Sequence, residues 1–210
     1  MAKTIGIFGG AFDPVHVGHT SLISDIQKII DFEKIFIIPS GKPVLKNIHF
    51  VDGDKRIEML DIAFKKNKGV HIDNREVLKE EVSYTFETLR EFHKEHKTNQ
   101  HFSFILGQDA FANFKSWKNW EELLNLCSLI VIKRPNYFFP SEYINDFKKN
   151  ITSSLSNFLT GHGNIFFAEN LMLDISSSDI RENVYKSEFK EINLDNEVLD
   201  YIKLNSLYKN

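Results

Sequence analysis

The sequence of 210 residues lacks three features that would assign it to a special class of protein. It has a single cysteine, Cys127, so an intrachain disulfide is excluded, and the apolar surroundings LNLCSLIVI predict a buried, inert thiol. No apolar run approaches the roughly 20 residues that a membrane span needs. The net charge of −3 gives no overall electrostatic reason to bind nucleic acid or an anionic membrane.

Targeting segments and the two common nucleotide-binding motifs are also missing. An apparent strand begins within three residues of the first methionine, which leaves no room for a signal peptide. Neither the G-x-G-x-x-G fingerprint nor a Walker A lysine is present, and no repeat or low-complexity tract interrupts the chain. We therefore expect a cytoplasmic enzyme or binding protein with one core.

Short apolar runs alternate with longer amphipathic stretches, and this pattern is typical of a parallel α/β sheet. We expect one Rossmann-like, doubly wound α/β domain over residues 1–210, with a C-terminal helical part from about residue 176. The expected strands are 4–8, 34–39, 70–72, 101–106, 129–133 and 164–168. The expected helices are 18–30, 54–66, 84–96, 117–126, 178–184 and 195–207. Residues 138–160 are polar and poorly periodic, which predicts helical turns in a surface excursion.

The most informative segment is IGIFGGAFDPVHVGH, residues 5–19. Gly9 and Gly10 end an apolar run, where they permit unusual dihedrals and a close approach of a ligand. After the Asp13-Pro14 turn, a helix that starts near Gly18 would present free amides and a positive dipole end to an anion. His16 and His19, three residues apart, would lie on one side of its first turn and donate hydrogen bonds to phosphate.

This segment has other interpretations besides a nucleotide site. It could be a glycine-rich turn with two surface histidines, but the length of the pattern favours a nucleotide site. A zinc site is disfavoured, because the two histidines have no obvious third ligand. Asp13 is interpreted as a turn former rather than a metal ligand. His93 and His96, also three apart, are expected on the solvated face of a Lys/Glu-rich helix.

Two further segments carry phosphate-suited groups. In ISSSDIR, Ser177 and Ser178 cap a short helix, and their hydroxyls can also hold phosphate. Arg181, three residues after Ser178, faces the same way with a planar fork that suits phosphate oxygens. In PSGKPVLK, Lys42 and Lys46 follow the second strand at the carboxyl edge of the sheet, where ligand sites collect. A solvated lysine pair is the ordinary alternative there.

Other segments offer groups for a flat ligand. Ser83-Tyr84-Thr85 opens a helix and reads by itself as a capping sequence. Core packing is the ordinary role of tryptophans, and we keep it for Trp120, whereas Trp117 at an exposed edge can stack on a heterocycle. After the fourth strand, Gly107 permits a close backbone approach, and Asp109 can accept hydrogen bonds from ribose or cap a helix.

GGAFDPVHVGH resembles the (T/S)-x-G-H-type signature of the nucleotidyltransferase superfamily, in the form GG-x-FDP-x-H-x-GH of the nicotinate-nucleotide adenylyltransferases. PSGKPVLK, SYTFETL, FILGQDAFANFKSWKNW, a strand ending in KRP, and ISSSDIR follow in the order of that family. The resemblance spans residues 5 to about 181. It implies the nucleotidyltransferase fold and, in NAD biosynthesis, the reaction of ATP with nicotinate mononucleotide to give nicotinate adenine dinucleotide and pyrophosphate.

The resemblance also implies roles for particular residues. His19 would be the principal donor to the reacting phosphate, helped by His16, Lys46 and Arg181. The residues implied for ATP are Gly9, Gly10, Ala11, Phe12, His16, His19, Lys46, Arg134, Ser177, Ser178 and Arg181. Those implied for the mononucleotide are Tyr84, Thr85, Gly107, Asp109 and Trp117. Mg²⁺ would bridge the ATP phosphates with few or no direct protein ligands.

Two other interpretations are open. The chain could be a superfamily member that acts on nicotinamide mononucleotide or phosphopantetheine, or a non-catalytic nucleotide-binding domain. SYT-x-x-TL and W-x-x-W favour a flat acidic pyridine ligand, and the presence of both His19 and Arg181 disfavours a non-catalytic domain. The expected partners are thus ATP and nicotinate mononucleotide, with neither nucleic acid nor membrane. The sequence does not determine acid versus amide preference, or whether the chain forms a homo-oligomer.

Overall fold

Six parallel strands form one sheet in the computed structural model of the protein, which describes residues 3–42, 51–96, 100–133, 139–169, 175–187 and 193–209. The strands are β1 (Thr4–Gly10), β2 (Phe32–Pro39), β3 (Val70–Ile72), β4 (His101–Gly107), β5 (Ser128–Ile132) and β6 (Ile165–Ala168). Their order is β3-β2-β1-β4-β5-β6, and every neighbouring pair is parallel. This order reverses between β1 and β4, so a crevice is expected where their carboxyl ends diverge.

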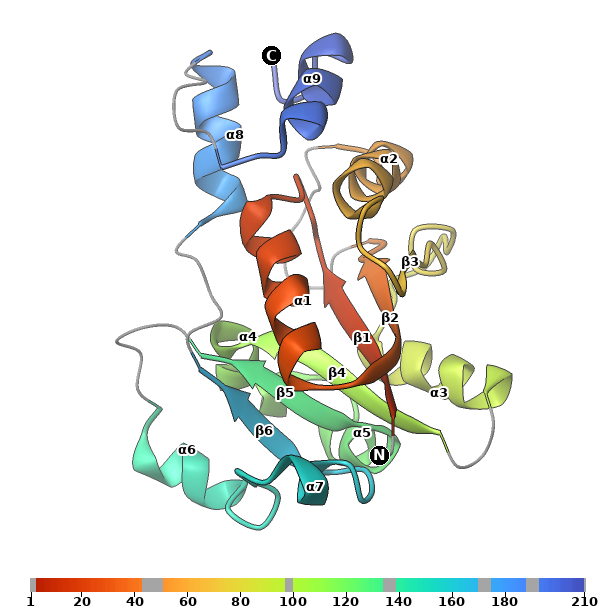
Figure 1. Ribbon diagram of the computed structural model, residues 1–210, viewed down its shortest axis with the longest axis vertical. Coiled ribbons are helices and arrows are strands. Elements are labelled where there is room, and N and C mark those ends of the chain that lie inside the picture. The colour runs from red at the N-terminus through yellow and green to blue at the C-terminus, as the bar shows by residue number, and fades with distance from the viewer. Residues whose placement is uncertain are drawn as a thin grey trace.

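Helices follow or cover the strands on both faces (Figure 1). They are α1 (Val17–Ile29), α2 (Gly53–Phe64), α3 (Thr85–Glu95), α4 (Gln108–Ala112), α5 (Trp120–Leu126), α6 (Ser141–Asp146), α7 (Leu155–Phe158), α8 (Ser177–Tyr185) and α9 (Asn196–Leu204). A 3₁₀ turn spans Phe114–Ser116. The predicted doubly wound α/β fold with C-terminal helices is confirmed.

Each face of the sheet has its own apolar core, because successive strand residues point to opposite faces. One core holds α1, α2, α8 and α9, and includes Ile23, Leu60, Ile180 and Ile202. The other holds α3 to α6 and is rich in aromatic rings, among them Phe92, Phe102, Phe111, Phe114 and Phe147. β5 serves both cores, with Ile130 on one face and Val131 on the other. The sheet is therefore buried on both faces, and the loops lie at the ends of its strands.

The structure bears on two expectations from the sequence, that Cys127 is inert and that no segment spans a membrane. Cys127 is fully buried, its Sγ donates to the Leu123 carbonyl at 3.6 Å, and burial raises the pKa of the thiol, as expected for an inert cysteine. Within the described residues, no helix combines the length and apolar character that crossing a membrane requires.

Some predicted helices differ from the observed ones. The helix expected at 117–126 begins only at Trp120, because Asn119 before it has left-handed backbone angles and Trp117 is extended. α4, with five residues, was too short to show a period and was missed. The helical turns expected within 138–160 are present as α6 and α7. The surface excursion is wrong in part, since Phe147 and Phe158 reach into the two cores.

The prediction of a solvated face for His93 and His96 is also wrong. The His93 ring lies 4.6 Å from that of Phe102, and its Nε2 is 2.7 Å from the Leu126 carbonyl oxygen. His96 stacks on Phe92. His162 joins this group, where it accepts a hydrogen bond from the Phe102 amide at 3.3 Å. The histidines gather at the amino end of β4, opposite the end that carries the signature loop.

The histidines at the amino end of β4 should make the protein less stable as pH falls. Burial, with the nearby His101 and His93, lowers the pKa of His162 to about 4. Because the unfolded side chain titrates near its ordinary value of 6.5, protons bind the unfolded chain preferentially as pH falls from about 6.5 towards 4. We expect His162→Gln, which keeps an acceptor for Phe102, to reduce the pH dependence of the free energy of unfolding between pH 6.5 and 4. The reduction should be at most about 1 kcal/mol per pH unit, because the His162 ring is partly exposed. Urea unfolding at several pH values measures it, and identical slopes for both proteins would contradict it.

Candidate active site

The glycine pair of the signature ends β1, and one part of its predicted role, the unusual dihedrals, is wrong. Of the glycines in the described residues, only Gly69 and Gly163 have left-handed backbone angles, so Gly9 and Gly10 do not supply unusual dihedrals. Phe12 has the positive φ instead, at 48°. A Cβ on Gly9 would lie 3.3 Å from the Phe104 ring, and one on Gly10 would lie 3.0 Å from the Phe12 ring. The glycines thus make room for aromatic rings beneath the loop.

His16 and His19 lie together at the start of α1, as predicted. His16 is the residue before the helix, and its backbone N–H donates to His19 Nδ1 at 3.2 Å. The two imidazoles stack with ring centroids 3.7 Å apart. A Cβ at position 18 would come within 3.0 Å of the His16 ring, which explains why a glycine stands there. Two helix amides are engaged, since Val17 N–H donates to Asn193 O and His19 N–H to His16 O.

The environment fixes the protonation of His19. Burial lowers the pKa of His16 to about 4, and burial with the neighbouring His16 lowers the pKa of His19 well below its ordinary value. Both rings are therefore neutral at pH 7. Because His19 Nδ1 accepts the His16 amide, its one proton resides on Nε2. His19 Nε2–H is thus a defined hydrogen-bond donor.

The amino end of α8 lies against the turn that precedes His16. Ser177 Oγ donates to the Pro14 carbonyl at 3.0 Å, and Arg181 Nη1 donates to the Asp13 carbonyl at 2.6 Å. Arg181 Nη2 also donates to Ser178 Oγ at 3.0 Å, so these two residues face the same way, as predicted. The structure therefore brings the ISSSDIR segment to the signature loop across more than 160 residues.

Arg56 is a site residue that sequence reasoning missed. It is 2% exposed on α2, and it donates from Nη1 to the Ala11 carbonyl at 2.9 Å and from Nε to the Val51 carbonyl at 3.2 Å. Burial lowers the pKa of Arg56, while Asp13, Tyr208 and Asp52 oppose that shift. Its spacing from Met59 and Leu60 placed it on the buried face of the helix, and this signal could have revealed it.

Tyr84 and Thr85 form the start of α3, with Tyr84 as the residue before the helix. The predicted capping by Ser83 is wrong, because Ser83 Oγ is buried and has no hydrogen-bond partner among the described residues. Lys118 Nζ lies 4.1 Å from the centre of the Tyr84 ring and 2.7 Å from Glu87 Oε1. The segment after the 3₁₀ turn is thereby attached to the start of α3.

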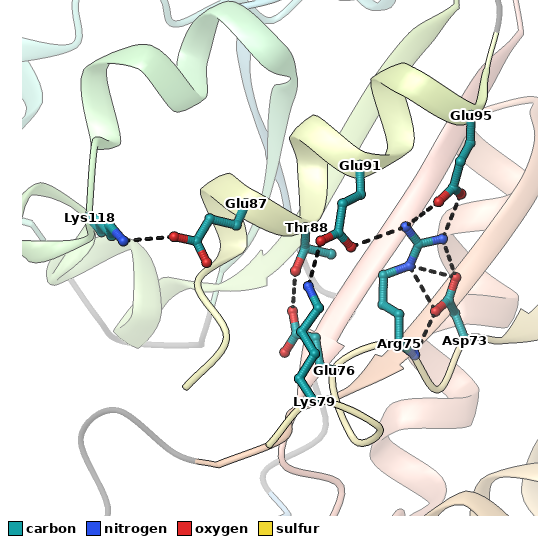
Figure 2. Close-up of polar contacts among 9 residues, drawn as sticks. All are labelled: Asp73, Arg75, Glu76, Lys79, Glu87, Thr88, Glu91, Glu95 and Lys118. Carbon is teal, nitrogen blue, oxygen red and sulfur yellow. Dashed lines mark hydrogen bonds and ion pairs between the residues drawn. The ribbon is translucent and has the colours of Figure 1, made fainter. Parts of the chain in front are cut away.

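Charged side chains hold the loop that leads to Tyr84 against α3 (Figure 2). Arg75 pairs with Asp73 and Glu95, and its guanidinium lies 4.0 Å from the centre of the Phe92 ring. Nearer to Tyr84, Lys79 pairs with Glu91 at 2.6 Å, and Thr88 Oγ1 donates to Glu76 Oε1 at 2.6 Å. These contacts join the segment 73–79 to the middle and end of α3.

The two tryptophans are both partly exposed and both pack against the aromatic core. Trp120 packs against Phe114 and Phe147 in the aromatic core. Trp117 is partly exposed and lies edge-on to Phe104, at 5.9 Å between ring centroids. Phe104 is the same ring that Gly9 accommodates, so it connects the signature loop to Trp117. Gly107 ends β4 at the same edge of the sheet, and Asp109 is exposed in the first turn of α4 rather than acting as its cap.

Two candidate ATP ligands, Lys46 and Arg134, lie outside the described residues. Ala11 is exposed and Phe12 buried in the signature loop. Within the described ranges, no three His, Cys, Asp or Glu side chains form a group that could hold a metal ion. The described candidates gather at the carboxyl edge of β1 and β4, with the histidines and Arg181 at one end and Tyr84, Thr85 and Trp117 at the other.

Comparison with known proteins identifies the family of the chain. The cytidylyltransferase-like family model matches residues 7–183. Curated proteins named probable nicotinate-nucleotide adenylyltransferase are similar along nearly their whole length. The protein of Legionella pneumophila is 34% identical, covering 98% of this chain and 99% of that protein, and the protein of Fusobacterium nucleatum is 35% identical, covering 88% and 89%.

The fold has solved counterparts. The Plasmodium falciparum nicotinic acid mononucleotide adenylyltransferase complexed with NaAD superposes with a TM-score of 0.72 at 21% identity, covering 98% of this chain and 97% of that one. A second structure of the Plasmodium protein, complexed with APC, gives 0.73. The chain therefore belongs to the cytidylyltransferase-like family and, within it, to the nicotinate-nucleotide adenylyltransferases.

Proposed function

We propose that this protein joins ATP to nicotinate mononucleotide, giving nicotinate adenine dinucleotide and pyrophosphate for NAD biosynthesis. The observation that carries the proposal is the neutral His19 at the start of α1, with its proton held on Nε2 beside the glycine loop and Arg181. These groups suit a polyphosphate, and the membership in the family supports the pyridine mononucleotide as second substrate.

The reaction needs no general base. The 5′-phosphate oxygen of the mononucleotide is ionised near neutral pH and attacks the α-phosphorus of ATP. A new P–O bond forms as the bond to the β-phosphate breaks, and pyrophosphate leaves with the electron pair. His19 Nε2–H donates to the reacting phosphate, and Arg181, His16 and Lys46 stabilise the charge that builds on the leaving group. We expect no covalent intermediate on the protein.

The charge of the substrates sets the remaining requirements. Mg²⁺ would enter with ATP, bound mainly by phosphate oxygens, as this cation commonly is. Binding of the polyanion would also raise the pKa of both histidines, since an opposite charge favours the protonated ring. Backbone amides of Tyr84 and Thr85 would hold the pyridine carboxylate at the positive end of α3. Asp109 would accept hydrogen bonds from ribose hydroxyls.

The two tryptophans give a matched test of the mononucleotide site. We expect Trp117→Ala to raise KM for nicotinate mononucleotide by about tenfold, because an aromatic stack contributes roughly 1 kcal/mol or more. Trp120→Ala should instead lower the free energy of unfolding by about 3 kcal/mol, since it empties part of a core. Steady-state kinetics and urea unfolding of both variants separate these effects. A KM unchanged in Trp117→Ala would remove this residue from the site.

The choice of second substrate is tested by pyrophosphate release from MgATP with three acceptors in parallel. We expect nicotinate mononucleotide to have the highest kcat/KM, above nicotinamide mononucleotide and phosphopantetheine. A preference for phosphopantetheine would overturn the substrate assignment. Binding of ATP with no product from any acceptor would support the non-catalytic alternative.

A further inference from the structure

The C-terminal end of the chain contacts the signature loop. Tyr208, which follows α9, donates from its phenol O–H to Asp13 Oδ1 at 2.6 Å. Asp13 is only 3% exposed and lies between the glycine pair and His16. In Figure 1, α9 lies at the same end of the molecule as α8 and the start of α1. A contact across 195 residues thus ends on the turn that carries the candidate catalytic histidines.

The backbone adopts a costly conformation to make this contact. Ser206 has φ of 51° and Tyr208 has φ of 60°, a left-handed region that bulky residues rarely adopt. Between them, Leu207 N–H donates to the Ile202 carbonyl at 3.0 Å. Such strain persists only where surrounding contacts determine the conformation, and it concentrates at functional sites.

The direction of the hydrogen bond is defined. Burial and the Asp13 carboxylate raise the pKa of Tyr208, so the phenol keeps its proton and donates. The backbone of the same turn is held by Arg56 at Ala11 O, by Arg181 at Asp13 O and by Ser177 at Pro14 O. Tyr208 adds the contact to the Asp13 side chain.

We propose that Tyr208 is a positioning residue for the phosphate site, which acts by holding Asp13 and thereby the turn that places His16 and His19. The inference rests on the proposed adenylyl transfer. Tyr208 itself does not touch the reacting atoms. Its hydroxyl matters because a displacement of about 1 Å in the turn would misalign the histidine donor during transfer.

The test compares two tyrosines of the same C-terminal segment. Tyr208→Phe removes only the hydroxyl that bonds Asp13, whereas Tyr201→Phe removes one that bonds Glu58 on α2. We expect Tyr208→Phe to lower kcat about tenfold with KM for the mononucleotide unchanged, and Tyr201→Phe to retain wild-type kcat. In an Asp13→Ala background, Tyr208→Phe should have no further effect, because the two act as one unit. Equal kcat for the two single variants, or additive losses in the double variant, would overturn the inference.

A binding measurement separates this inference from the proposed function. If the wild-type protein forms no dinucleotide with any acceptor, the proposed adenylyl transfer is wrong, and calorimetric titration with a non-hydrolysable ATP analogue then tests Tyr208. We expect Tyr208→Phe to weaken analogue binding about tenfold relative to Tyr201→Phe. Equal affinities would show that the contact does not position the phosphate site.

Discussion

Replacing His19 with asparagine is expected to lower kcat about 10²–10³-fold, the cost of losing a donor aimed at developing charge. The Asn Oδ1 can occupy the place of His19 Nδ1 and still accept the His16 amide, so the start of α1 keeps its cap. We therefore expect Tm to stay within about 2 °C of the wild type, since little stability is lost. Steady-state kinetics and a thermal melt measure the two quantities.

A second substitution at the same position serves as the control. His19→Gln places an amide N–H near the position of Nε2, so it should recover part of the kcat that His19→Asn loses. A kcat within threefold of wild type for His19→Asn would contradict the donor role. Equal kcat in both variants would show that the position of the Nε2 proton does not matter.

The largest effect on stability is expected at Arg56. Its substitution by methionine removes a buried charge and leaves the Ala11 and Val51 carbonyls without their donor. Asp13 would also lose one of its nearby positive charges while remaining buried, with Arg181 left as the other. Breaking one side of such a buried set costs about 3–5 kcal/mol, so Arg56→Met should lower the free energy of unfolding by that amount. Urea unfolding, with the slope m checked for constancy, measures the loss.

Two further variants serve as controls for the stability loss of Arg56→Met. Arg90 is exposed on α3, and Arg90→Met should change the free energy of unfolding by less than about 0.5 kcal/mol. Arg56→Lys keeps the charge but cannot reproduce the planar fork, so it should recover only part of the stability. If Arg56→Met unfolds within about 1 kcal/mol of Arg90→Met, Arg56 does not hold the loop.

The fold could be predicted because its determinants are local and periodic. Alternation of short apolar runs with amphipathic stretches located all six strands. β1 ends two residues later than predicted, and β2 begins two residues earlier. α4 could not be found this way, because five residues complete little more than one turn of a helix. The late start of α5 depends on the left-handed conformation of Asn119. Asparagine tolerates this conformation but also adopts others, so its presence in the sequence does not indicate where the helix begins.

The candidate site was predictable where one segment carries it. His16 and His19 stack as their spacing indicates, and Ser178 and Arg181 share a face of α8. Contacts between distant segments were not predictable, because no local pattern pairs residue 13 with residue 208 or residue 11 with residue 56. For Gly9 and Gly10 the expected unusual dihedrals were wrong, and the contact between Gly9 and the Phe104 ring could not be read from the local sequence.

The central claim is direct transfer of an adenylyl group to a pyridine mononucleotide. Its most direct test supplies the full chain with MgATP labelled at the α-phosphorus and with nicotinate mononucleotide, then separates the products. The account predicts that all transferred label appears in nicotinate adenine dinucleotide, with one pyrophosphate released per dinucleotide and no label on the protein. Formation of ADP, release of the label as AMP, or label bound covalently to the protein would contradict it.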